Sequence, residues 1–109
     1  MLSYNDLKAA IKDNNATLLC KLMENIKSSY GCSIDIKRLI RLCIFYGAEF
    51  CFSYIFHSVN WEISELNKLS SDVEERLNSF EDDSTRYKFS IIRDTINKKF
   101  YRETLGLIL

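Results

Sequence analysis

Apolar residues recur along the first half of the chain with the spacing of an amphipathic helix. Between residues 4 and 58 they repeatedly stand three and four positions apart, which is the period of one face of an α-helix. The pair Asn14–Asn15 and Gly47 interrupt this pattern, and both residue types tolerate the left-handed conformation that ends a helix. We therefore predict two helical hairpins, over residues 4–28 and 36–58, that turn at Asn14–Asn15 and at Gly47.

The second half of the chain has a less regular pattern. Residues 61–80 contain only short amphipathic turns, and the pair Ser70 and Ser71 has the composition of a junction or helix cap, so we predict an irregular helical segment there. The acidic stretch 81–85 predicts a loop whose serine or threonine caps the next helix. Residues 86–109 predict a degenerate third hairpin that turns near its lysine pair.

The composition of the whole chain favours helices. The 109 residues include no proline and only three glycines, although turns in sheet-rich domains commonly use both. Hydrophobic residues make up 47% of the chain, which is enough for one core in a domain of ordinary size. We therefore predict a single all-α domain over residues 1–109.

The two predicted hairpins correspond to each other at an offset of about 33 residues, a period typical of helical repeats. The stretch AAIKDNNATLLCKLM at 9–23 aligns with LCIFYGAEFCFSYIF at 42–56, and we call this shift the repeat offset. Small residues mostly fall on small residues, turn formers on turn formers and apolar residues on apolar ones. The aligned pairs are Ala10 with Cys43, Ile11 with Ile44, Asn14 with Gly47, Leu18 with Cys51, Leu19 with Phe52, Leu22 with Ile55 and Met23 with Phe56.

This stretch resembles the core of an ankyrin repeat, and the aromatic-rich FYGAEFCF is similar to divergent ankyrin repeats of protist and viral proteins. The family's T-P-L-H opening is absent, since DLKA and RLIR stand in its place, and Ile44 occupies a position that is small in the family. The resemblance implies antiparallel hairpins stacked into a fragment of a solenoid. An unrelated, small irregular helical bundle is the alternative fold.

The resemblance also implies a function, because ankyrin-like proteins recognise other proteins through the exposed residues of their first helices. The implied function is that of a non-enzymatic protein–protein interaction module without a cofactor. Carried over by position, the partner-binding residues are Lys12, Asp13, Lys37, Phe45 and Tyr46. Phe45 and Tyr46 are aromatic and would serve as interface anchors. The alternative is that residues 61–80 cover both rings.

The most apolar stretch, residues 39–56, does not have the composition of a membrane span. It is near the lower length limit for a spanning helix, and it contains Arg41 and Glu49, which are costly in the bilayer centre. The N-terminus has no cationic flank followed by an apolar core, as a secretory leader would. We therefore expect no membrane partner and an intracellular location, cytoplasmic or nuclear, or in the host cell if the protein is viral.

The sequence contains no clear catalytic, metal-binding or nucleotide-binding motif. The four cysteines lack C-x-x-C spacing, and we expect Cys43 and Cys51 to be packing residues, although the sequence leaves disulfide pairing open. His57 is the single histidine, and its neighbour Ser53 faces it on a helix, yet a histidine in the last helical turn more often has a structural role. Phosphate-binding glycine loops are absent. We therefore predict no enzyme activity, no metal and no cofactor.

The net charge of the chain and its apolar C-terminal residues indicate which classes of partner to expect. Fifteen basic and fifteen acidic residues give no net charge, whereas non-specific nucleic-acid binders usually carry a basic excess. The clusters Lys37–Arg38–Arg41 and Lys98–Lys99–Arg102 are surface groups or, alternatively, contacts to an acidic partner or phosphate. The chain ends on the apolar LGLIL. This end motivates the alternative function, a small helical-bundle effector of viral type that binds a host protein and forms homo-oligomers.

Overall fold

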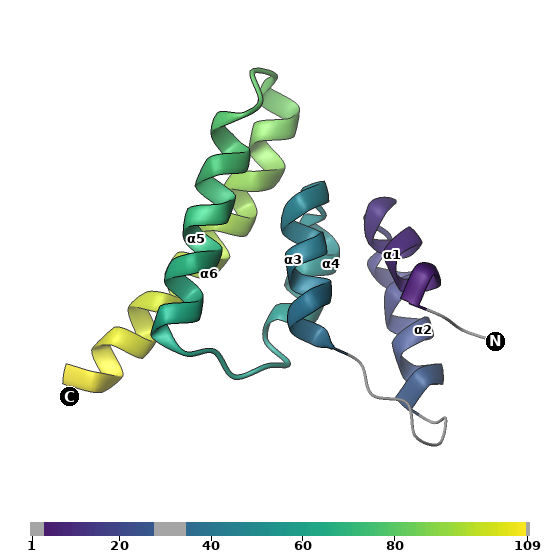
Figure 1. The fold of residues 1–109 in the computed structure, drawn as a ribbon, viewed down its shortest axis with the longest axis horizontal. Helices are drawn as coiled ribbons and strands as arrows, with labels where there is room; N and C mark the ends of the chain where they lie inside the picture. The colour runs from purple at the N-terminus through teal and green to yellow at the C-terminus, as the bar shows by residue number, and fades with distance from the viewer. Residues whose placement is uncertain (1–3, 28–34, 109) are drawn as a thin grey trace. The chain divides into compact units, whose positions relative to one another are not determined.

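The fold was analysed in a computed structural model, which describes residues 4–27 and 35–108 (Figure 1). Within these ranges every regular element is an α-helix, so the predicted all-α class is confirmed. The chain divides into two compact units, residues 1–59 and 60–109, where one domain was predicted.

The first unit begins with a hairpin of α1 (Tyr4–Lys12) and α2 (Ala16–Lys27). Asn14 adopts the left-handed conformation, with φ 53°, and reverses the chain between the two helices. Asn15 then caps α2, because its side-chain Oδ1 accepts a hydrogen bond of 3.0 Å from the Leu18 N–H. Asn14 therefore bends the backbone at the turn, and Asn15 caps the helix that follows.

The second hairpin consists of α3 (Ile36–Tyr46) and α4 (Glu49–Phe56). Asp35 caps α3 through a 3.1 Å hydrogen bond from the Arg38 N–H. Gly47, with φ 66°, takes the left-handed position that Asn14 takes in the first hairpin. As predicted, the chain turns at both residues.

The backbone of the first turn recurs in the second one at the repeat offset. The Asn15 N–H donates to the Ala10 carbonyl at 2.9 Å, and the Ala48 N–H donates to the Cys43 carbonyl at the same distance. These are the bonds of one helix-ending motif made twice, at equivalent positions. α2 and α4 likewise begin at equivalent residues, 16 and 49.

The two hairpins lie side by side, because α1 packs against α3 and α2 packs against α4. Equivalent positions are buried in both, and the larger of these core residues form the pairs Leu7 with Ile40, Ile11 with Ile44, Leu19 with Phe52 and Met23 with Phe56. Among the aligned apolar pairs the clearest difference is between Cys51, which is fully buried, and Leu18, which is 41% exposed. Cys51 faces the first hairpin, with its Sγ 3.8 Å from the Ala10 carbonyl, whereas the same side of α2 points away from the second hairpin.

Asn14 also joins the two hairpins. Its side-chain Oδ1 accepts hydrogen bonds from the backbone N–H groups of Phe50, at 3.0 Å, and Cys51, at 3.3 Å. Both donors belong to the first turn of α4, whose own N-cap residue, Ala48, makes no side-chain cap. The first hairpin therefore supplies the cap that the second one lacks.

The second unit consists of α5 (Ile63–Asn78) and α6 (Asp83–Ile108). The irregular segment predicted for 61–80 is instead a regular helix from Ile63, and Ser70 and Ser71 lie within it. A capping box explains its start, since the Glu62 N–H donates to the Glu65 side chain at 3.1 Å. Helical i,i+3 and i,i+4 spacing then places Leu66, Leu69, Val73 and Leu77 on one buried face.

The predicted third hairpin over 86–109 is not formed, because α6 is one continuous helix. Neither glycine nor proline interrupts residues 83–105, and Lys98 and Lys99 are good helix formers. The predicted caps, Ser84 and Thr85, are also wrong. Asp82 is the cap, with its Oδ2 accepting from the Thr85 N–H at 2.9 Å, and its hydrogen bonds with Thr85 lower the pKa of Asp82.

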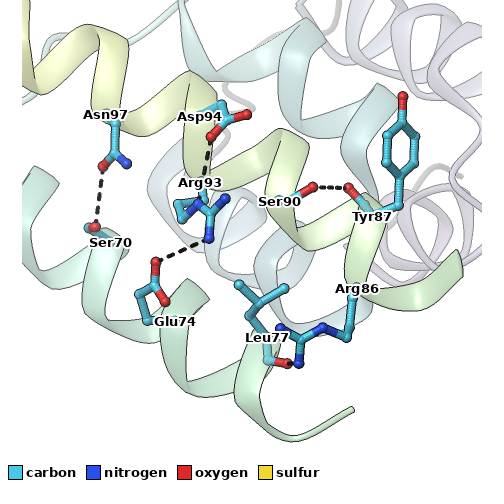
Figure 2. A network of polar contacts seen from close by, with 9 residues as sticks. All are labelled: Ser70, Glu74, Leu77, Arg86, Tyr87, Ser90, Arg93, Asp94 and Asn97. Carbon is cyan, nitrogen blue, oxygen red and sulfur yellow. Dashed lines mark hydrogen bonds and ion pairs between the residues drawn. The ribbon is translucent and has the colours of Figure 1, made fainter. Parts of the chain in front are cut away.

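α5 and α6 pack as an antiparallel pair (Figure 2). The Ser70 hydroxyl donates to Asn97 at 3.4 Å, and Glu74 lies 3.6 Å from Arg93, so residues later in α5 meet residues earlier in α6. Arg86 closes the turn by donating to the carbonyl oxygens of Leu77 and Phe80. Between the helices lie the buried side chains of Leu66, Leu69, Val73, Leu77, Phe89, Ile92 and Ile96.

Candidate functional site

Two rows of exposed side chains lie next to each other on the first helices of the two hairpins. One row belongs to α1 and the other to α3, and equivalent positions are again related by the repeat offset. We define the α1–α3 face as the exposed residues Lys8, Lys12, Arg38, Arg41 and Phe45. Lys8 is equivalent to Arg41 and Lys12 to Phe45.

The packing of the two helices brings these rows together. The Arg38 guanidinium carbon lies 4.0 Å from the centre of the Tyr4 ring, a cation–π contact that joins the start of α3 to the start of α1. Asn14 joins the other ends through its bonds to α4, so α1 and α3 run parallel. Equivalent residues are therefore separated by about one helix spacing, roughly 8–10 Å.

The cations of the α1–α3 face have no carboxylate partners among the described residues. Lys8, Lys12, Arg38 and Arg41 form no ion pair there, and Asp13 is the carboxylate that follows Lys12 at the end of α1. On α6, by contrast, Lys99 lies 3.1 Å from Glu103 and Arg93 lies 3.6 Å from Glu74. Like charges one helical turn apart repel each other, so the face favours the approach of an anionic group.

The structure places four of the five predicted partner-binding residues at the C-terminal ends of α1 and α3. Lys12, Asp13 and Phe45 are exposed at the C-terminal ends of α1 and α3, and Phe45 is 53% exposed. Tyr46 is half-buried beside them, with its ring edge-on to Phe45 at 5.0 Å between centroids. Lys37 is half-buried at the opposite end of α3 and does not join this group.

Sequence reasoning missed Lys8 and grouped Arg38 and Arg41 with Lys37 rather than with α1. The signal was present in the repeat offset, since Lys8 aligns with Arg41 and places a cation at the same position in both hairpins. Apolar positions at the repeat offset define the core, and polar positions at the same offset identify the face.

A second group of exposed aromatic residues lies on α4. Phe50 is 64% exposed, and Tyr54, one turn later, is also exposed. A hydrogen bond with Cys20 of α2 raises the pKa of Tyr54. Phe50 was not among the predicted site residues. The repeat offset indicates its exposure, because its equivalent, Thr17, is polar and exposed.

The remaining candidates for chemistry are not brought together. Ser53 of α4 and His57, the C-cap residue that follows α4, are both exposed and share no hydrogen bond among the described residues. The His57 ring stands edge-on to Phe56 at 5.4 Å. Nowhere in residues 4–27 and 35–108 do three histidine, cysteine or acidic side chains gather as metal ligands would. Cys32 lies outside the described residues.

Cys43 and Cys51 are buried free thiols, which confirms their prediction as packing residues. Burial, followed by the nearby Cys51 sulfur, raises the pKa of Cys43 well above its ordinary value. Burial and the neighbouring Glu49 raise the pKa of Cys51 to about 11. Because the thiolate is the reactive form, both groups are expected to be inert at neutral pH.

This burial gives a prediction about thiol reactivity. In a Cys32→Ser variant, an aromatic disulfide reagent should react rapidly with Cys20, which is half-buried, and with Cys43 and Cys51 only as the protein unfolds. The unfolding free energy should also fall as pH rises from 9 towards 11, since unfolded thiols ionise near 9.0 and the native ones remain protonated. Rapid labelling of three thiols in the native protein would contradict the prediction.

The second predicted basic cluster lies on α6. Asp94, Asn97, Lys98, Tyr101 and Arg102 line an open, shallow hollow along one side of the helix, and Lys99 is paired with Glu103 instead. The lining residues contributed by α6 carry both signs of charge. The hollow therefore shows no strong preference for an anion.

The described helices and the comparisons with known proteins complete these observations. No helix within the described part of the chain has both the length and the apolar character to cross a bilayer. The chain matches no family model, no curated protein and no solved structure.

Proposed function

We propose that the protein is a non-enzymatic protein–protein interaction module that binds its partner with the α1–α3 face. The observation that carries this proposal is the side-by-side placement of two exposed rows from equivalent helices, with Phe45 half exposed at one end. The mechanism is surface complementarity, with the hairpin core holding the two rows in place. No covalent step is involved.

The arrangement of the hairpins supports an ankyrin-like mode of binding. Their turns share conformation and hydrogen bonding at the repeat offset, and their first helices pack against each other. α1 and α3 are held together by the Arg38–Tyr4 contact and by the bonds from Asn14, which follows α1, to the start of α4. They therefore form a stiffer surface than one helix would. A pre-organised surface loses less conformational entropy on binding.

A large exposed aromatic side chain at the end of this surface supports the same proposal. Phe45 is 53% exposed and contacts Tyr46, and aromatic residues are common energetic anchors of protein interfaces. Truncating an exposed ring removes contact area from a partner while leaving the core of the hairpin intact. Phe45 and Tyr46 are therefore the residues with which to test the proposal.

The test is a pull-down from cell extract that compares the wild type with a Phe45→Ala, Tyr46→Ala double variant. We expect the double variant to keep its far-ultraviolet circular dichroism and to lose specific captured proteins. Phe50→Ala, on the other exposed surface of the same unit, is the matched control and should retain them. Equal capture by all three proteins would refute the α1–α3 face as the binding surface.

The alternative function, a viral-type effector that self-associates through its C-terminus, is motivated by exposed apolar side chains near the end of α6. Tyr101 and Leu105 are both exposed, one turn apart, and two apolar residues on one face can seed a helix–helix contact. Light scattering distinguishes the two proposals. A dimer that Leu105→Glu dissociates favours this alternative, and a concentration-independent monomer excludes it.

A further inference from the structure

We infer that the partner of the α1–α3 face is a short acidic segment of another protein that carries carboxylates beside one apolar residue. This inference rests on the proposed function and specifies the chemistry of the partner. The carboxylates would lie over Lys8, Lys12, Arg38 and Arg41, and the apolar residue would lie against Phe45.

The first observation is the uncompensated charge of the face. Its four cations come from two helices, and none has an ion-pair partner among the described residues. α3 contains no acidic residue, and the one acidic residue of α1, Asp6, does not belong to the face. A partner that brought carboxylates would form the ion pairs that the described residues do not provide, and Arg38 and Arg41 can each bind a carboxylate with two hydrogen bonds.

The second observation is the size of the face. From Arg38 to Phe45 the helix rises about 10 Å, at 1.5 Å per residue. An extended peptide advances about 3.3 Å per residue, so three or four residues cover this length. A short segment with two or three carboxylates is therefore sufficient, and the apolar side chain belongs at the end where Phe45 is 53% exposed.

The third observation separates a carboxylate partner from a nucleic acid. Nucleic-acid affinity depends on neutralising several phosphates along a continuous basic track, but the face is short and is bordered by the Asp13 carboxylate at the Phe45 end. The chain as a whole has no net positive charge. An apolar anchor next to the cations instead fits a peptide, whose side chains alternate in chemistry along the chain.

The experiment uses a charge-reversed variant, Lys8→Glu with Arg41→Glu, and the full-length protein. The two substitutions relieve repulsion, because a glutamate at position 8 would stand four residues before Lys12 in the favourable orientation. The variant should therefore be at least as stable as the wild type in urea unfolding. Lys21→Glu, an exposed lysine of α2 in the same unit, is the matched control for a charge reversal elsewhere.

The probe is a short fluorescent peptide of glutamate and aspartate with one terminal leucine, measured by anisotropy at low ionic strength. We expect saturable binding to the wild type and to Lys21→Glu, a loss of about tenfold or more in the double variant, and weakening with added salt. A peptide with the amide residues in place of the acids should not bind. Phe45→Ala should weaken the leucine peptide more than an all-acidic one.

Four outcomes would overturn the inference. The first two are no binding of the acidic peptide and equal binding by the double variant. The third is tighter binding of single-stranded RNA than of the peptide. The fourth is a wild-type oligomer that the double variant dissociates, because the face would then bind a second copy of the chain. If the peptide fails while capture in the pull-down still depends on Phe45 and Tyr46, the proposed function stands without this partner class. If replacing Phe45 and Tyr46 also leaves capture unchanged, both the proposed function and the acidic partner are refuted.

Discussion

Replacing Asn14 with alanine is expected to lower the free energy of unfolding by about 2–3 kcal/mol, through two losses at one residue. Alanine has no acceptor for the N–H groups of Phe50 and Cys51, which Asn14 binds at 3.0 and 3.3 Å, and a lost helix cap typically costs about 1 kcal/mol. Alanine is also strained at a φ of 53°, at a cost of roughly 1–2 kcal/mol.

Two further variants separate these losses. Asn14→Asp keeps an acceptor at the start of α4 and should retain most of the stability, because aspartate is also a good cap and favours a helix N-terminus. Asn14→Gly removes the cap without the strain, so its unfolding free energy should fall between those of the aspartate and alanine variants. Urea unfolding followed by far-ultraviolet circular dichroism ranks the three. An aspartate variant as unstable as the alanine one would show that the side chain does not cap α4.

The first half of the fold was predictable because local and repeated signals agree there. Asn14 and Gly47 each stand where an apolar stripe ends, and the repeat offset makes each turn a check on the other. The bond from Asn14 to the start of α4 was not predictable, since it depends on how far apart two separately folded turns lie. Sequence spacing defines positions along a helix and gives no distance between helices.

The second half was predicted less well because polar residues were interpreted as breaks. Ser70 and Ser71 lie inside α5, and Lys98 and Lys99 lie inside α6. A helix ends where a cap or breaker replaces its backbone bonds, and none of these four residues acts in that way. Asp82 does cap α6. Aspartate and serine are similarly good N-cap residues, so the sequence indicated Asp82 as strongly as Ser84.

The candidate site was predicted in part for a related reason. Family resemblance selected the ends of the first helices, where Lys12, Asp13 and Phe45 are indeed exposed. It gave no information about pairing of charges, so the four cations of the α1–α3 face were not recognised as one group. Whether a cation has a partner depends on the neighbouring helix, and this is visible only once α1 and α3 are placed together.

The phenylalanines of α4 provide the largest expected effect of a single substitution. Phe52→Ala should lower the unfolding free energy by about 3–5 kcal/mol, because Phe52 is fully buried and removal of a buried ring leaves a cavity. Its ring also stacks on Phe56, with 4.8 Å between centroids. The matched control is Phe50→Ala on the same helix, where the ring is 64% exposed and the expected loss is within about 0.5 kcal/mol.

This pair of variants also tests the repeat. In FCF the two phenylalanines are chemically identical, and the repeat offset distinguishes them by aligning Phe52 with the buried Leu19 and Phe50 with the exposed Thr17. If the positions are equivalent, Phe52→Leu should be tolerated far better than Phe52→Ala, since leucine already fills that place in the first hairpin and retains most of the buried apolar surface. Urea unfolding measures all three variants. Equal losses for Phe50→Ala and Phe52→Ala would contradict both the burial of Phe52 and its equivalence to Leu19.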